Sequence, residues 1–258
     1  MSVTASSHHS PPGWRLVWAE EFDGPEIDRN RWEFAIDARG GGNDELQYYT
    51  DRPENAFIRD SCLVIAARRE RYIGDEGTRD YTSARLRTRN RGDWLCGRFE
   101  IRARLPHTQG LWPAIWMMPT DEAYGGWASS GEIDIVELLG HRPDEVLGTL
   151  HHGDAFPRNV HTGHAYRLPA GDFSRDFHDF ALEWRPGEFR WLVDGHTYQT
   201  QTVWHTNAAP YPAPFDKRFH MILNVAVGGR LPGDPDASSA FPQEMAVDYV
   251  RVYEAAAR

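Results

Sequence analysis

The stretch Gly131-Glu132-Ile133-Asp134-Ile135-Val136-Glu137 sets three carboxylates into a run of branched aliphatic residues. Such residues favour a β-strand, where successive side chains alternate between two faces. Glu132 and Asp134 would share a face, but Glu137 would point to the other. One β-bulge between Asp134 and Glu137 would bring all three together. A helix fits less well, because positions i, i+2 and i+5 share no helix face. The stretch therefore predicts a bulged strand.

The spacing of the two glutamates on this strand bears on chemistry. With the bulge, their Cα atoms lie about four strand steps, or roughly 13 Å, apart. Side chains that lean toward each other would bring the carboxyl groups to about 5 Å, as in a retaining glycosidase; an inverting enzyme needs about 6.5–9.5 Å. The alternatives are a solvated acidic strand or a metal-binding acidic cluster, which the branched neighbours disfavour.

The rest of the chain also predicts strands. Residues 98–105 alternate charged and apolar side chains, which is typical of a half-buried strand. Pro186-Gly187 and Asp194-Gly195 are typical hairpin turns. No long stretch has helical periodicity, and there is no internal repeat, so an all-β sandwich or barrel is expected. Further predicted strands cover 14–22, 62–68, 112–119, 146–152, 180–184, 189–193, 196–202, 220–227 and 246–254.

The composition of this 258-residue chain excludes some classes of binding partner. Its net charge of -10 argues against nucleic acid and disfavours a polyanionic sugar. Aromatic residues make up 12%, which suits a surface that stacks on flat ligands, although sandwich cores also use them. No run of about 18 apolar residues predicts a membrane span.

Residues 1–13 are rich in Ser, His and Pro and lack the apolar segment of a signal peptide. We expect a disordered lead-in there, followed by a single domain over 14–258. Either the protein stays inside the cell, or a native signal has been removed. Cys62 and Cys96 could form one disulfide or remain as two buried thiols.

The motif from Glu132 to Glu137 resembles the catalytic motif of glycoside hydrolase family 16, in the bulged form typical of laminarinases (endo-1,3-β-glucanases). The resemblance extends in the family's order over about residues 14–254. It implies a concanavalin A-like β-jelly roll of two curved antiparallel sheets, with a substrate cleft on the concave face. The other matching segments are 16–22, 44–50, 81–85, 111–117, 148–151, 223–229 and 247–253.

The resemblance also implies roles for the three carboxylates. Glu132 would be the nucleophile and Glu137 the acid/base, while Asp134 would hydrogen-bond Glu132 and hold it in place. Three carboxyl groups on one face cannot all ionise cheaply, so at least one pKa should rise. No cofactor is expected for catalysis.

Three tryptophans are candidates for sugar stacking. The family equivalents of Trp112 and Trp116 line sugar subsites, and these two residues would share a face on a plain strand. Trp127, shortly before the acidic motif, is a further cleft candidate. Core packing is the alternative for Trp112 and Trp116.

Polar cleft residues are also implied by the resemblance. Arg85 matches an arginine that hydrogen-bonds sugar hydroxyls, with a surface ion pair as the alternative. Asn43 follows Gly40-Gly41-Gly42 and matches a residue at the lip of the cleft, although Asp44 after it departs from the family pattern. His151 matches a histidine near the acid/base, on the leaving-group side.

Two metals come into consideration. The resemblance implies a structural calcium far from the cleft, with Glu21, Asp248 and carbonyls near Asp60 as ligands. A salt-bridged pair without an ion is the alternative. The pairs His151-His152 and His161-x-x-His164 suggest zinc, but no carboxylate or Cys completes a known ligand spacing in the sequence, so zinc is not predicted.

These features predict a monomeric retaining endo-β-glucanase that cuts β-1,3-glucan and, as a second substrate, mixed β-1,3/1,4-glucan. An agarase-like enzyme or a transglycosylase would keep the chemistry and change the sugar or the acceptor. A lectin-like β-glucan-binding module is disfavoured, because such relatives lose the glutamates. The predicted substrate would place the protein outside the cell.

Overall fold

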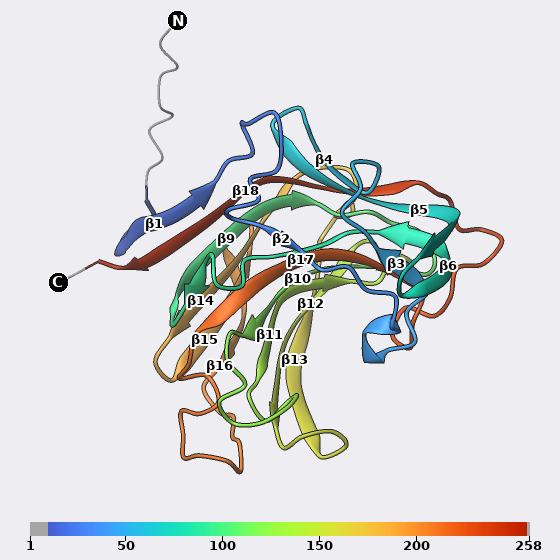
Figure 1. The fold of residues 1–258 in the computed structure, drawn as a ribbon. Helices are drawn as coiled ribbons and strands as arrows, with labels where there is room; N and C mark the ends of the chain where they lie inside the picture. The colour runs from blue at the N-terminus through green and yellow to red at the C-terminus, as the bar shows by residue number, and fades with distance from the viewer. Residues whose placement is uncertain (1–9, 257–258) are drawn as a thin grey trace, which may run out of the picture.

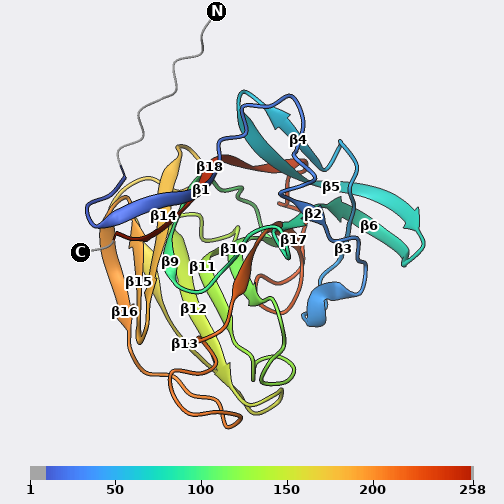
Figure 2. The ribbon, with the colours of Figure 1, turned by 60° about the vertical axis from the view of Figure 1, so that its left-hand side comes forward.

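Two stacked β-sheets make up the computed structural model, which describes residues 10–256 (Figure 1). Both sheets are curved, and strands that are distant in sequence are neighbours within them (Figure 2). All strand pairs are antiparallel except β3 with β6. Among the described residues, no helix is long and apolar enough to cross a membrane. The all-β prediction is thus confirmed, while residues 1–9 of the predicted lead-in lie outside the described part.

The first sheet has ten strands, and its main path runs β16-β15-β14-β9-β18-β5-β6-β3. Outside that path, β1 pairs with β18 and β4 pairs with β5. The strands are β1 (Trp14–Glu20), β3 (Gln47–Tyr49), β4 (Ala56–Arg59), β5 (Cys62–Gly74), β6 (Gly77–Ser83), β9 (Gly97–Arg104), β14 (His178–Arg185), β15 (Glu188–Val193), β16 (His196–Gln201) and β18 (Gln243–Ala255).

The second sheet has eight strands in the order β13-β12-β11-β10-β17-β7-β2, with β8 paired to β17. The central strand β17 is buried at every position, as expected of a strand covered on both faces. The strands are β2 (Glu33–Phe34), β7 (Arg85–Arg87), β8 (Asp93–Trp94), β10 (Leu111–Pro119), β11 (Glu132–Leu138), β12 (Glu145–Gly153), β13 (Asn159–Arg167) and β17 (Phe219–Val227). A short 3-10 turn, η1 (Gly40–Gly42), precedes β3.

The core lies between the sheets and follows the alternation in sequence. On β9, Phe99, Ile101 and Ala103 are buried, while the charged residues between them face outward. The two predicted hairpin turns also form, and Asp194 and Gly195 both have positive φ angles, as a tight two-residue turn requires. The first sheet packs its buried side chains against one face of the eight-stranded sheet and so fixes its position.

Candidate active site

The acidic strand β11 contains the predicted bulge. Its pairing with β12 shifts register between Asp134 and Glu137, and its pairing with β10 skips Ile135. The extra residue restores the alternation, so Glu132, Asp134 and Glu137 all line the same cleft. The bulge therefore assembles the three carboxyl groups that the sequence predicted to share a face.

Each carboxyl group has a specific neighbour. The Trp127 indole N–H donates a 2.7 Å hydrogen bond to Oε2 of Glu132. The Trp112 indole N–H donates a 2.9 Å hydrogen bond to Oε1 of Glu137. His151 Nε2 lies 3.2 Å from Asp134 Oδ2 and 3.7 Å from Glu132 Oε1. Trp127 and Trp112 thus fix the carboxyl groups of the two glutamates, and His151 faces Asp134 and Glu132.

Burial governs the electrostatics of this cluster. It raises the pKa of Glu132 and of Asp134 well above their ordinary values, and neighbouring carboxylates add to both shifts. The pKa of Glu137 is also raised by burial, against which the Trp112 hydrogen bond acts. The cluster therefore retains protons at a pH where isolated carboxyl groups would have lost them.

A residue of the ten-stranded sheet contacts the bulge from the side that faces the core. Trp191 on β15 donates a 2.8 Å hydrogen bond to the backbone carbonyl of Asp134. It packs closely because residue 148 on β12 is a glycine: a Cβ there would lie 2.4 Å from the Trp191 ring and 2.5 Å from the Tyr198 hydroxyl. Gly148, which the sequence placed only within a matching segment, allows this close approach of the sheets.

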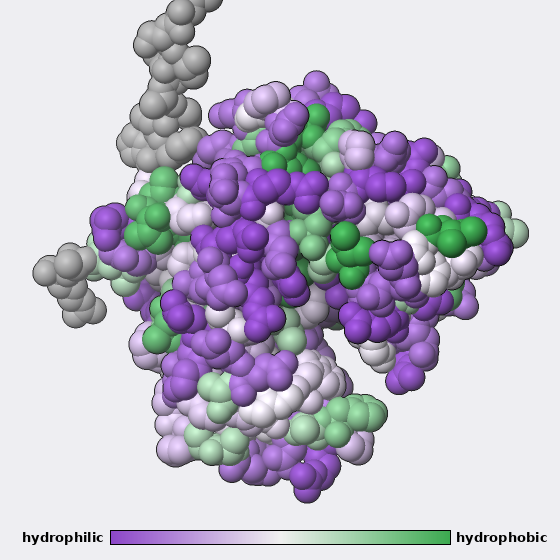
Figure 3. Space-filling view, in the orientation of Figure 1, coloured by the Kyte–Doolittle hydropathy of each residue, from purple (hydrophilic) through white to green (hydrophobic). Residues whose placement is uncertain are grey.

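A cleft of about 1060 Å³ crosses the eight-stranded sheet above β11. All nine residues predicted for catalysis and substrate binding line it, namely Asn43, Arg85, Trp112, Trp116, Trp127, Glu132, Asp134, Glu137 and His151. In Figure 3 the surface is hollowed beside the loop that carries η1. Lining residues that the sequence did not single out for this site include Glu45, Phe156, His161, His164, Asn224 and Leu231.

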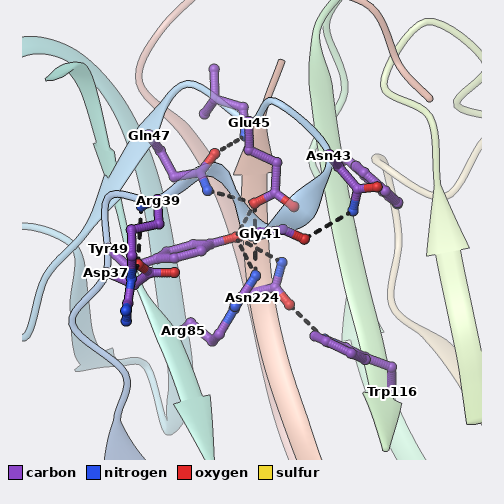
Figure 4. Close-up of polar contacts among 12 residues, drawn as sticks. Asp37, Arg39, Gly41, Asn43, Glu45, Gln47, Tyr49, Arg85, Trp116 and Asn224 are labelled. Carbon is purple, nitrogen blue, oxygen red and sulfur yellow. Dashed lines mark hydrogen bonds and ion pairs between the residues drawn. The ribbon is translucent and has the colours of Figure 1, made fainter. Parts of the chain in front are cut away.

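One wall of the cleft is a buried polar network (Figure 4). Arg85 lies 3.7 Å from Glu45 and above the Tyr49 ring, so it does form an ion pair, but inside the cleft wall and not at the open surface. Asn224 donates to the Tyr49 hydroxyl at 3.1 Å and accepts from the Trp116 indole at 2.6 Å. This network fixes the orientation of Trp116 at the cleft.

The lip of the cleft holds the predicted Asn43. Its side chain lies 3.4 Å from the carbonyl of Gly41, and its own carbonyl accepts a hydrogen bond from the Arg230 backbone. Asp44, the departure from the family pattern, pairs with Arg230 at 2.8 Å. The two positions together tie the glycine loop to the segment after β17.

The two acidic residues predicted to bind calcium, Glu21 and Asp248, are not among the residues that line the cleft. Each forms an ion pair with an arginine. Arg251 donates two hydrogen bonds to the Glu21 carboxylate, at 2.8 and 2.7 Å. Arg102 Nε lies 3.2 Å from Asp248 Oδ2. A hard cation would have to displace both guanidinium groups before it could use these oxygens. Elsewhere, Cys62 and Cys96 are free thiols.

Glutamate carboxyl groups that lie together in an open, tryptophan-lined cleft are the groups that glycoside hydrolysis requires. Comparison with known proteins agrees. Residues 43–251 match the model of glycosyl hydrolases family 16. The chain belongs to this family, and it is a glycoside hydrolase.

Similar proteins cover almost the whole chain. A β-glucanase of Rhodothermus marinus is 46% identical over 255 residues, which is 94% of this chain and 86% of the relative. A glucan endo-1,3-β-glucosidase of Cryptopygus antarcticus is 44% identical over 250 residues, covering 92% and 91% of the two chains. The laminarinase catalytic domain of Thermotoga maritima superimposes with a TM-score of 0.84 at 44% identity, covering 95% of this chain and 99% of its own. The predicted jelly roll is thereby confirmed.

Proposed function

We propose that the protein is a retaining endo-β-glucanase that hydrolyses β-1,3-glucan and, beside it, mixed β-1,3/1,4-glucan. The observation that carries the proposal is the bulged strand β11, which presents one half-buried and two buried carboxyl groups to a tryptophan-lined cleft. The names of the relatives support the substrate, because they include glucan endo-1,3-β-glucosidases. An endo-1,3-1,4-β-glycanase of Rhizobium meliloti, 33% identical, supports the second linkage.

In this mechanism Glu132 attacks the anomeric carbon and forms a covalent glycosyl-enzyme. The Trp127 hydrogen bond and the nearby His151 both favour the ionised form of Glu132 that attack requires. Asp134 shares a hydrogen bond with Glu132, while burial and the charge of Glu137 raise its pKa. The hydrogen bond orients the nucleophile, and the raised pKa limits the negative charge beside it.

Glu137 acts first as the acid and then as the base. Burial raises its pKa, which keeps a proton available for the leaving glycosidic oxygen. Once that oxygen has left with the proton, the Glu137 carboxylate takes a proton from water, which hydrolyses the glycosyl-enzyme. These steps use carboxyl groups alone and require no cofactor.

The walls of the cleft would hold the glucan. Trp112 and Trp116 are only partly exposed and offer indole faces to pyranose rings, while Trp127 is 37% exposed at the cleft. We assign Arg85 and Asn43 to sugar hydroxyls beyond this tryptophan pair. The partial burial of Trp112 and Trp116, with each indole N–H already bonded inside the protein, leaves the ring faces for stacking.

A structural calcium at Glu21 and Asp248 remains a proposal, with residues near Asp60 as further ligands. The measurement is the melting temperature before and after chelation, with calcium then restored. Because Arg251 and Arg102 already neutralise the two carboxylates, we expect a shift below about 2 °C, the size that ~1 kcal/mol produces in a domain of this length. A small fall that calcium reverses would establish the ion, and an unchanged melting temperature would refute it.

The experiment that tests the function is product analysis on laminarin, barley β-glucan, agarose and xyloglucan. A ladder of reducing oligosaccharides from laminarin, with a weaker ladder from barley glucan, is expected. Cleavage of agarose without laminarin would keep the carboxylate mechanism and overturn the substrate. Binding without cleavage of any glycan would overturn the enzyme assignment altogether.

A further inference from the structure

Three potential metal-ligand atoms meet beside the bulge of β11. Glu132, Asp134 and His151 each offer one ligand atom, and these atoms lie within 4.8 Å of one another; His151 Nε2 faces Oε1 of Glu132 and Oδ2 of Asp134. The histidine comes from β12, where it pairs directly with Glu132 across the ladder. The set therefore spans two neighbouring strands and does not follow one sequence motif.

Two of the three separations are close to the edges of a small coordination tetrahedron. Zinc binds imidazole nitrogen and carboxylate oxygen at about 2.0–2.2 Å, so two ligand atoms of one ion lie roughly 3.3–3.6 Å apart. His151 Nε2 is 3.2 Å from the Asp134 oxygen and 3.7 Å from the Glu132 oxygen. An ion between them would need only small side-chain adjustments.

Apart from the contacts among the three residues themselves, these atoms have no competing hydrogen-bond partner in the described part of the chain. Asp134 is 2% exposed, and its Oδ2 accepts no hydrogen bond from the described residues, although it points at the imidazole of His151. Trp127 occupies the other oxygen of Glu132, Oε2, and leaves Oε1 toward the histidine. A buried carboxylate oxygen without a donor is costly and is well satisfied by a cation.

We propose that Glu132, Asp134 and His151 form a binding site for a zinc-like dication, open to the cleft on its fourth side. One imidazole and two carboxylates suit zinc, whereas magnesium requires near-octahedral oxygen coordination. A water molecule from the cleft would complete the shell, and the His161 ring, whose centroid is 5.9 Å from that of His151, lines the same cleft.

Occupancy of this site has a functional consequence, which rests on the proposed function. The ion takes the oxygen of Glu132 that faces His151, so the nucleophile cannot attack while the metal is bound. Zinc and glucan therefore exclude each other. Micromolar zinc should raise KM for laminarin, leave kcat at saturating substrate unchanged, and lose its effect when a chelator is added.

The test measures metal binding directly. Isothermal titration of the full chain with zinc chloride should show one site that magnesium chloride does not fill. His151→Ala and Asp134→Asn should each weaken that site by more than about tenfold. His164→Ala is the matched control, because His164 lines the same cleft on β13 and is not part of the ligand set, so it should leave zinc affinity unchanged.

Two outcomes would overturn the proposal. Zinc affinity that survives both His151→Ala and Asp134→Asn, with melting curves showing folded variants, would place the ion elsewhere. Absence of zinc binding to the wild-type chain would exclude the site outright. Neither outcome depends on glucan cleavage, so a failure of the metal site is distinguishable from a failure of the proposed hydrolase function.

Discussion

Trp112→Phe should separate the two roles of this tryptophan. The variant keeps an aromatic face for a sugar ring but loses the 2.9 Å hydrogen bond to Glu137. A hydrogen bond to a charged group contributes about 1.5–3 kcal/mol. This bond favours the carboxylate and so lowers the pKa of Glu137, and its loss should raise that pKa by about one unit or more.

The assay is kcat/KM on a soluble β-glucan between pH 4 and 10. Because Glu137 must be protonated to act as the acid, the alkaline limb should move to higher pH, and the maximum should fall about ten- to a hundredfold as the carboxyl group loses its anchor. Trp116→Phe is the control, since its indole bonds Asn224 and no carboxyl group. It should raise KM and leave the limb in place. An unmoved or lowered limb in Trp112→Phe would refute the reasoning.

Three further predictions concern the nucleophile, the core and acid stability. Glu132→Gln should lose activity by several orders of magnitude with an unchanged melting temperature, and wild-type turnover would exclude it as the nucleophile. Gly148→Ala should lower the free energy of unfolding by about 1–3 kcal/mol in urea titrations, because its Cβ collides with the opposite sheet. Burial lowers the pKa of His152 and of His220 to about 4, so both resist protonation when folded. The contribution of these two histidines to stability is complete above about pH 6.5 and is lost toward pH 4, a loss of a few kcal/mol over that window. Replacing both with Gln should remove this part of the pH dependence.

The parts of the fold that the sequence predicts correctly are those with strong alternation. The strand around Phe99 and the hairpin at Asp194-Gly195 each follow from residues close together in the chain, and both form as expected. The edge strand β13 was missed, because an exposed strand at the end of a sheet has no apolar face to show. Short strands such as β7 were missed for a related reason, because three residues are too few to show an alternation of polar and apolar side chains.

The candidate site divides in the same way. The carboxylates, Trp112 and Trp116 were predictable because they lie on strands, where alternation and one bulge determine which way they face. Trp127 lies in the loop before β11, so only its nearness to the acidic motif pointed to it. The network of Tyr49, Arg85 and Asn224 was not, because those residues come from β3, β7 and β17, and only the tertiary fold brings them together. The same limit applies to His151, whose pairing with Glu132 across two strands cannot be read from ligand spacing along the sequence.

The bulge explains why one short stretch determines so much of the molecule. On a regular strand, the odd spacing between Asp134 and Glu137 would turn the Glu137 carboxyl group toward the core between the sheets. Burying an unpaired charge there would cost several kcal/mol. The register shift turns Glu137 to the cleft, where Trp112 bonds it, while Ile135 and Val136 stay buried. Trp191 stabilises the distortion by donating to the carbonyl of Asp134, and it can do so only because residue 148 has no side chain. The chemistry of the cleft therefore depends on a packing contact from the opposite sheet, which ties the activity of the enzyme to the core of the sandwich.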